Sequence, residues 1–267
     1  MTLYTIREAL SKKVFVFFFI ISVLILVVLG LVFGFLQTNS ILNTFNPSLD
    51  QFQAVNFVTE LELIIISPLA NLCLLLAIFS SANFVPSMLE KGNIDLLISK
   101  PVSRQQLIWG KFLGGLLIVL VEVAFLILGV WLIISIKFST WNFNVLNTIW
   151  IITFTFAVLY SVIVLFGVMT QSSIFGMMIA YFIFLIVSPI LLAFNDNRLP
   201  FVTSDIVKQV LKGLYYFFPK TSELMVNIFN ASASGAGIQN FQPLVSSFIF
   251  LLLMMFLSGT VFNKKDF

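Results

Sequence analysis

Residues 14–36 read VFVFFFIISVLILVVLGLVFGFL, and this charge-free run decides the fold class. A helix needs about 20 consecutive apolar residues to cross the hydrocarbon core of a bilayer, so the run is long enough to span a membrane. Basic residues precede it, as they precede a signal peptide, but the apolar region of a signal is only about 7–15 residues long. We therefore expect residues 14–36 to form a membrane-spanning helix.

The whole chain shares the apolar character of this run. Of its 267 residues, 60% are hydrophobic and 9% are charged, and the mean hydropathy is +1.10. Soluble domains carry about 25% charged residues, so this chain has too few charges to cover a surface in water. The net charge of +3 gives no reason to expect a nucleic-acid partner. With no His and a single Cys, Cys73, the sequence provides neither a His/Cys metal cluster nor an internal disulfide.

Six apolar runs are long enough to span a bilayer. They are Val14–Leu36, Leu61–Val85, Leu107–Ile136, Thr148–Thr170, Ile174–Phe194 and Leu244–Phe262. The runs lack strict alternation and are too long for barrel strands, so each is predicted to be a helix. Only residues 171–173 separate the fourth run from the fifth, which predicts a tight helical hairpin. We expect an all-α membrane protein with six transmembrane helices in one transmembrane domain, residues 1–267.

The distribution of Lys and Arg predicts that both termini are cytoplasmic. Nine of these residues fall on the side of the termini and five on the other side, and the loop between the first two spans has none. Cytoplasmic loops carry the excess of Lys and Arg. The cytoplasmic side then has one substantial loop, Pro86–Gln106, and a long outer loop, Asn195–Pro243, joins the fifth and sixth spans.

Two further segments are predicted to be amphipathic helices that lie at the membrane interface. One is the N-terminal segment Met1–Lys13, in which Leu3, Ile6 and Leu10 share a face. The other is Ser204–Phe218 in the long outer loop, which Pro219 ends. Its apolar stripe is formed by Ile206, Val207, Val210, Leu211 and Leu214, and Lys208 and Lys212 face water.

The most informative cytoplasmic stretch, residues 88–114, reads MLEKGNIDLLISKPVSRQQLIWGKFLG. The pattern predicts a short helix that is broken near Gly92 and stops before Pro101, with Ser103 capping the third span. Ile94, Leu97 and Ile98 form a small apolar face. This face suits a docking surface for another protein and equally a stiff connector lying against the membrane, and the residues alone leave both interpretations open.

The same stretch resembles the cytoplasmic signature of the permease subunits of type-2 ABC exporters. The matching residues are Glu90, Gly92, Asp95, Leu96, Leu97, Pro101, Ser103, Arg104, Gly110 and Lys111. The resemblance implies that Glu90–Leu97 is a coupling helix for a separate ATPase subunit. It implies the coupling residues Glu90, Gly92, Asp95, Leu96, Leu97, Pro101 and Arg104, together with a contact of the N-terminal helix, Thr2–Lys13, with the ATPase.

The resemblance also implies the partners and the location. They are two copies of a cytoplasmic ABC ATPase subunit, a second permease copy that forms a homodimer or a related heterodimer, and membrane lipids, in the cytoplasmic (inner) membrane of a prokaryote. ATP would bind the partner subunit, and this chain would bind no cofactor. Helices one, two and five would then surround a central path.

The sequence does not predict an enzyme. The Gly110-Lys111 pair has Gln105 where a phosphate-binding loop needs its first Gly and Phe112 where it needs Ser or Thr. The absence of His removes common acid–base and triad chemistry. We expect an exporter permease whose cargo is hydrophobic or amphipathic. The alternative is a non-transporting membrane component of an ABC-type complex for motility or for metallo-cofactor or copper-enzyme maturation.

Glu122 is the one acidic residue in the middle of a predicted span. A charge there costs about 2.5–3.5 kcal/mol on insertion scales. It therefore marks either a transport path or gating pair, or a neutral carboxyl that hydrogen-bonds between helices for packing. Glu60 and Glu62, at the outer start of the second span, are expected to be solvated, and Pro68 and Pro189 are expected to kink the second and fifth spans.

Overall fold

The computed structural model of the chain describes residues 13–35, 51–89, 103–196, 198 and 205–265. Every regular element within these residues is a helix, as predicted. Six helical stretches are long and apolar enough to cross a membrane, which confirms the predicted number of spans. They are Val16–Phe35, Phe57–Met88, Arg104–Phe138, Phe143–Thr170, Ser173–Asn195 and Gln242–Lys264. The predicted Glu90–Leu97 helix, and all of the predicted Met1–Lys13 helix except Lys13, lie outside the described residues.

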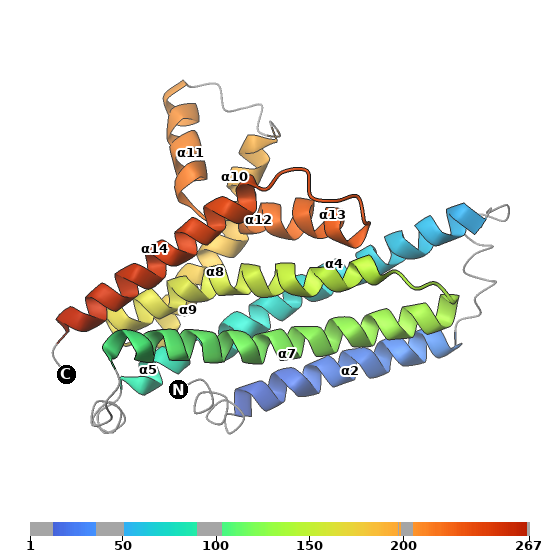
Figure 1. Cartoon of the computed structure of the whole chain (residues 1–267), viewed down its shortest axis with the longest axis horizontal. Helices are drawn as coiled ribbons and strands as arrows, with labels where there is room; N and C mark the ends of the chain where they lie inside the picture. The colour runs from blue at the N-terminus through green and yellow to red at the C-terminus, as the bar shows by residue number, and fades with distance from the viewer. Residues whose placement is uncertain (1–12, 36–50, 90–102, 197, 199–204, 266–267) are drawn as a thin grey trace.

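Five of the six spans are built around a single long α-helix. The bounds of the helices are Lys13–Phe35 for α2, Gln51–Ser81 for α4, Phe84–Met88 for α5, Arg104–Phe138 for α7, Asn147–Thr170 for α8 and Gln242–Lys264 for α14. The fifth span has three consecutive parts, α9 (Ser173–Phe182), the π-helical segment η2 (Ile183–Val187) and α10 (Ser188–Asn195). We call the end of the bundle where α7 begins and where α8 and α14 finish the motif end, and the opposite end the loop end (Figure 1).

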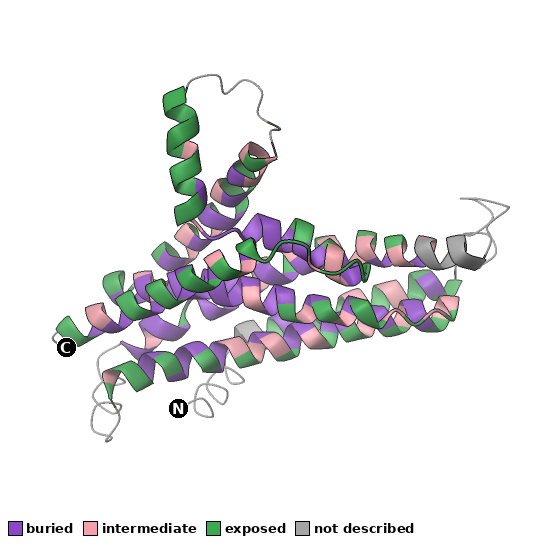
Figure 2. Cartoon of the chain, turned by 45° about the horizontal axis from the view of Figure 1, so that its top comes forward, coloured by how far each residue is buried: buried purple, intermediate pink, exposed green. Residues whose placement is uncertain are grey.

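Helix α8 lies at the centre of the bundle. Most of its side chains are buried, whereas its neighbours keep an exposed side (Figure 2). It packs against α14, α9, α7 and α4. Its sequence is apolar on all sides, which is the pattern of a fully buried helix. By contrast, α2 exposes most of its apolar side chains and packs mainly on α7, which leaves a broad surface suited to lipid.

The predicted tight hairpin between the fourth and fifth spans is confirmed. Gln171 ends α8 in a left-handed conformation with φ 56°, and its backbone N–H donates to the carbonyl of Gly167 at 2.9 Å. Ser172 then caps α9, since its hydroxyl accepts from the backbone N–H of Phe175 at 3.5 Å. A Cβ added at Gly176 would lie 3.1 Å from the carbonyl oxygen of Ile163, so a glycine lets α9 approach the backbone of α8 closely.

The predicted cap of the third span is also confirmed. The Ser103 hydroxyl accepts from the backbone N–H of Gln106 at 3.3 Å, and the Gln106 side chain accepts from the backbone N–H of Ser103 at 3.1 Å. This reciprocal capping box satisfies two of the orphan donors at the start of α7. Helix α7 extends past the predicted apolar run, Leu107–Ile136, at both ends.

Two helical segments lie between the fifth and sixth spans. The first is α11 (Asp205–Phe217), which projects sideways from the bundle and is exposed along nearly its whole length (Figures 1 and 2). The second is a buried helix in three parts, α12 (Thr221–Glu223), the π-helical segment η3 (Leu224–Ile228) and α13 (Phe229–Ala233), which packs on α8. The described helix α11 agrees with the predicted amphipathic helix, Ser204–Phe218.

Candidate functional site

The structure describes only part of the motif that the sequence singles out. Arg104 is the first residue of α7. The other six predicted coupling residues lie outside the described residues; they are Glu90, Gly92, Asp95, Leu96, Leu97 and Pro101.

Arg104 joins the start of α7 to the end of α14. Its Nη1 donates to the main-chain carbonyls of Phe262 at 3.3 Å, Asn263 at 3.4 Å and Lys265 at 2.9 Å. The last four carbonyls of a helix have no partner within the helix, and they carry partial negative charge. A cation placed there satisfies carbonyls that would otherwise need water. The Arg104 side chain thus fixes the position of α14 relative to the first turn of α7.

A second cation makes the same kind of contact at this end. Lys265 Nζ donates to the carbonyls of Val168 at 3.0 Å and Met169 at 3.1 Å, in the last turn of α8. We call Arg104 and Lys265 together the carbonyl clasp. The clasp links the motif ends of α7, α14 and α8.

Close packing of α7 on α8 supports the clasp. Phe112 stacks on Tyr160 with ring centroids 5.5 Å apart, and Tyr160 stacks on Phe156 at 5.2 Å. A Cβ added at Gly115 would lie 2.9 Å from the Tyr160 hydroxyl oxygen, so this position has no room for a side chain. Lys111, the lysine of the matched Gly-Lys pair, is buried, with 4% of its surface exposed.

Glu122 lies inside the bundle and is 7% exposed. Its Oε2 has no hydrogen-bond partner among the described residues, and it lies near the buried thiol of Cys73 in α4. Glu122 does not line any of the three cavities described below and in the following subsections. The geometry therefore places this carboxyl between helices α7 and α4.

A polar network closes the loop end of the bundle. The Asn142 amide donates to Glu62 Oε2 at 3.2 Å and to the carbonyl of Ala233 at 3.1 Å, and the Trp131 indole donates to the Asn142 carbonyl at 2.9 Å. Glu62 is fully buried, so the expectation that it is solvated is wrong, whereas Glu60 is exposed as expected. The two acids lie on different faces of α4, and only Glu62 points at the loop that follows α7.

A cavity of about 440 Å³ lies between α4, the η2–α10 part of the fifth span and the start of the α12–η3 helix. Its polar lining residues are Ser67, Asn71, Arg198 and Ser222. Its apolar walls include Leu75, Phe184, Leu185, Pro189, Met225 and Val226. We call it the α4–α10 cavity. Its lining is largely apolar, with a few polar groups, which is the usual make-up of a small-molecule site.

The backbone around this cavity is irregular on two sides. Both π-helical segments, η2 and η3, contribute lining residues, and Pro189 is the second residue after η2. π-Helical turns are rare and occur frequently at functional sites. The hydroxyl of Tyr181, just before η2, donates to the carbonyl of Leu75 in α4 at 2.8 Å and ties the two walls together.

Sequence reasoning missed a buried ionisable group at the junction of α11 and α12. Lys220 and Glu223 are each 4% exposed, and Tyr215 is the one buried residue of α11. Lys220 Nζ lies 3.7 Å from the centre of the Tyr215 ring, and the Tyr215 hydroxyl lies close to the Glu223 carboxyl. We call these three residues the hinge cluster. The sequence suggested only that Lys220 is one of several cations in an outer loop.

The hinge cluster is held by the neighbouring spans, and burial shifts its titration. The backbone N–H of Lys220 donates to the hydroxyl of Ser247 in α14 at 3.1 Å, and that of Ser222 donates to Ser188 at 2.8 Å. Burial lowers the pKa of Lys220, and the nearby charge of Glu223 partly offsets this. Burial raises the pKa of Glu223, while the Tyr215 hydrogen bond and Lys220 oppose the rise.

A second cavity, of about 410 Å³, adjoins the hinge cluster. Glu223 lines it together with Asn227, Gln239 and Asn240, so this cavity is more polar than the α4–α10 cavity. It lies between the α12–α13 helix and the segment that leads into α14.

The family comparison agrees with the arrangement of spans. A family model described as ABC-2 family transporter protein matches residues 5–267. The matched region contains all six candidate spans, the carbonyl clasp, the α4–α10 cavity and the hinge cluster. No curated protein matches the sequence.

Proposed function

Because this chain belongs to the ABC-2 transporter family, we propose that it is the permease subunit of an exporter driven by a separate cytoplasmic ATPase. The observation that carries the proposal is the family match across residues 5–267, which coincides with six candidate spans. The sequence itself contains no phosphate-binding loop, so the energy would come from the partner chain. Two permease copies and two ATPase copies would form the working complex in the cytoplasmic membrane of a prokaryote.

In this proposal the motif end faces the cytoplasm and receives the ATPase. The distribution of Lys and Arg supports this orientation. Glu90, Gly92, Asp95, Leu96 and Leu97 would contact the ATPase, and Pro101 would end the coupling helix just before α7. The carbonyl clasp would then carry the movement from the first turn of α7 to α14 and α8.

The α4–α10 cavity is our candidate for one wall of the transport path. Its largely apolar lining, together with the hydroxyl groups of two serines, one amide and the Arg198 guanidinium, suits an amphipathic or hydrophobic cargo. The exposed apolar side of the fifth span, including Leu185 and Ile190, would allow such a cargo to enter from the lipid. The two π-helical segments and Pro189 give this wall backbone irregularities at which it can change shape.

The coupling role is tested with the complete complex. The chain is co-produced with the ATPase encoded beside it and reconstituted in nanodiscs, and ATP hydrolysis is measured for the wild type, Glu90→Arg and Gly92→Pro. We expect both variants to assemble and to lose most of the permease-dependent stimulation of hydrolysis, because charge reversal and a helix-breaking residue alter the docking helix. Lys212→Gln, on the exposed helix α11, is the matched control and should behave as the wild type.

Two results would overturn the proposal. One is the absence of an ATPase that copurifies with the chain. The other is wild-type hydrolysis and assembly in both Glu90→Arg and Gly92→Pro, which would show that this loop does not couple the subunits.

Mass spectrometry of small molecules that copurify with the complex then identifies the cargo. Asn71→Leu, in the α4–α10 cavity, should reduce the amount of bound cargo if the cavity is part of the path.

A further inference from the structure

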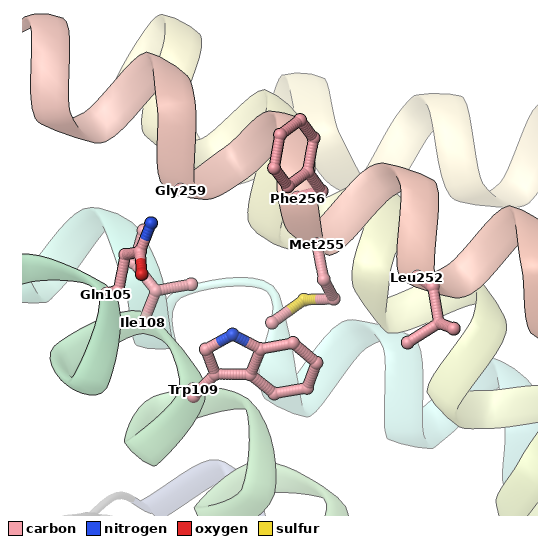
Figure 3. A pocket seen from close by; sticks show the side chains of 7 residues that line it. All are labelled: Gln105, Ile108, Trp109, Leu252, Met255, Phe256 and Gly259. Atoms are coloured by element: carbon pink, nitrogen blue, oxygen red, sulfur yellow. The ribbon is translucent and has the colours of Figure 1, made fainter.

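A groove of about 310 Å³ lies between the first turns of α7 and the second half of α14. Figure 3 shows Trp109 from α7 and Met255 from α14 pointing toward each other, with Gln105 and Gly259 at one end and Leu252 at the other. This groove belongs to the motif end and is separate from the α4–α10 cavity.

The groove opens toward the lipid-facing surface. Trp109 is 39% exposed, Leu252 42% and Phe256 68%, although all three lie in spans. Apolar side chains exposed on a span face hydrocarbon, so a lipid acyl chain is the molecule that this surface meets. The shape of the groove therefore fits a chain running alongside Leu252 and Phe256.

The end of the groove nearest the carbonyl clasp is lined by the polar residue Gln105, and two basic residues lie near it in the chain. The Gln105 amide lies beside Gly259, where a Cβ would be 3.9 Å from Gln105 Nε2. Arg104 precedes Gln105 in the chain, and Lys264 is exposed in the last turn of α14. None of the residues that line the groove is acidic. Basic pockets between spans on the cytoplasmic side are known to hold anionic lipid head groups, and tryptophans favour head-group depth.

We propose that this groove binds one anionic phospholipid of the cytoplasmic leaflet. An acyl chain lies against Leu252, Met255 and Phe256, and the head group lies at the Gln105 amide and the Trp109 indole N–H, within reach of Arg104 and Lys264. The inference rests on the orientation given under the proposed function. Because the head-group end adjoins the carbonyl clasp, the bound lipid joins α7 and α14 at the point where Arg104 already joins them.

Tryptophan fluorescence provides the test on the complete chain in nanodiscs without ATPase. Dibrominated phosphatidylglycerol or dibrominated phosphatidylcholine is titrated into unlabelled phosphatidylcholine, and quenching of Trp109 is taken as the difference between the wild type and Trp109→Phe. Phe at 109 keeps an aromatic ring beside Phe112, which Trp109 contacts edge-on at 5.9 Å. We expect the anionic lipid to quench Trp109 at an about fivefold lower mole fraction, the factor that one neighbouring basic residue supplies.

Three variants make the result specific. Gly259→Leu fills the groove, and its Cβ would make only ordinary contacts, 3.7 Å from Gln105 Cγ, so the helix tolerates it and Trp109 quenching should fall. Gly30→Leu on α2, where a Cβ meets nothing within 4 Å, is the matched control and should bind lipid as the wild type. Lys264→Gln should remove the preference for phosphatidylglycerol and leave quenching by phosphatidylcholine unchanged.

Equal quenching of Trp109 by the two lipids, or identical quenching in Gly259→Leu and Gly30→Leu, would overturn the inference, because the groove would then hold only bulk lipid. Neither result requires ATP or a partner chain. If the groove shows no lipid preference while Glu90→Arg uncouples the ATPase, the lipid site fails and the proposed function stands. If the anionic lipid quenches Trp109 selectively but the chain stimulates no ATPase, the lipid site is supported and the proposed exporter function is contradicted.

Discussion

Arg104 contacts residues that are distant from it in the sequence. Its three acceptors are carbonyls about 160 residues away in sequence, at the end of α14. A charge-assisted hydrogen bond is worth more than a neutral one, and the carbonyls it satisfies are expensive to leave unpaired in a membrane. Arg104 therefore contributes to the stability of the motif end, together with Lys265.

We expect Arg104→Ala to lower the stability of the permease by about 2 kcal/mol, because a charge-assisted contact is lost and helix-end carbonyls are left without a protein partner. Arg104→Lys keeps the charge but not the fork of donors, so it should recover only part of the loss. Thermal unfolding in nanodiscs measures the effect. Lys212→Ala, at an exposed site on α11, is the control. Equal unfolding temperatures for Arg104→Ala and the control would contradict the structural role of the clasp.

The substitution Glu122→Gln separates the two interpretations of this carboxyl. Glu122 is buried and its Oε2 lacks a hydrogen-bond partner in the described part of the chain, so we expect the isosteric amide to keep assembly, thermal stability and ATP hydrolysis at wild-type levels. Glu62→Gln is the matched control, since an amide oxygen can still accept from Asn142. Normal stability with lost transport in Glu122→Gln alone would instead assign Glu122 to the path.

Single residues were predicted well where the cause is local and poorly where it is distant. Ser103 was predicted as a cap because its partner, Gln106, lies three residues away. The burial of Glu62 was missed because its partner, Asn142, lies 80 residues away. Lys220 was read as a loop cation, since nothing in the sequence near it indicates that α14 and α10 cover it.

At the scale of elements, hydrophobic periodicity predicted the six spans and α11, but it missed the buried helix formed by α12, η3 and α13 and the π-helical irregularities. The six spans and the amphipathic α11 follow from apolar runs and from a helical stripe. The π-helical segments η2 and η3 have no such signal, because an extra residue in one turn leaves the apolar composition unchanged. Both segments line the α4–α10 cavity, so the sequence predicted the two spans beside this cavity but not the π-helical segments that line it.

The hinge cluster should make the thermal stability of the chain depend on pH, and this dependence can be measured. Burial raises the pKa of Glu223 above its ordinary value of 4.5, so the folded state binds this proton more tightly than the unfolded state does. The contribution of Glu223 to stability is therefore complete below about pH 4.5 and is lost as the pH rises through the raised value. We expect the unfolding temperature of the wild type to fall more steeply with rising pH in this window than that of Glu223→Gln.

The control for this prediction is Asp205→Asn, which removes an exposed carboxyl at the far end of α11 and should leave the slope unchanged. The measurement is thermal unfolding in nanodiscs between pH 4.5 and pH 8. Parallel pH profiles for the wild type and Glu223→Gln would show that the buried carboxyl does not titrate as its surroundings require. Burial lowers the pKa of Lys220, so the folded state binds this proton less tightly than the unfolded state does. The effect of Lys220 on stability therefore has the opposite sign, and the folded state gains stability as the pH rises.

For the whole molecule, composition predicted the class and the short motif predicted the family. The fold is all-helical with six candidate spans, and the family match extends over residues 5–267. The packing order could not be predicted, because nearly every span is apolar on all sides and so has no face that marks its neighbours. That α8 rather than another span occupies the centre became clear only from the burial of its side chains. The orientation in the membrane stays a prediction from Lys and Arg.

Helix α7 is uninterrupted over its whole length. It runs from Arg104 to Phe138 without a proline or a π-helical segment, whereas α4 contains Pro68 and the fifth span contains η2. At 1.5 Å per residue, about 40 Å separate Arg104 in the clasp from Trp131 in the loop-end network. The helix is thus a continuous rod that connects the carbonyl clasp with the loop-end network. In the proposed transporter, a displacement of its first turn would reach the opposite end of the span with nearly the same size.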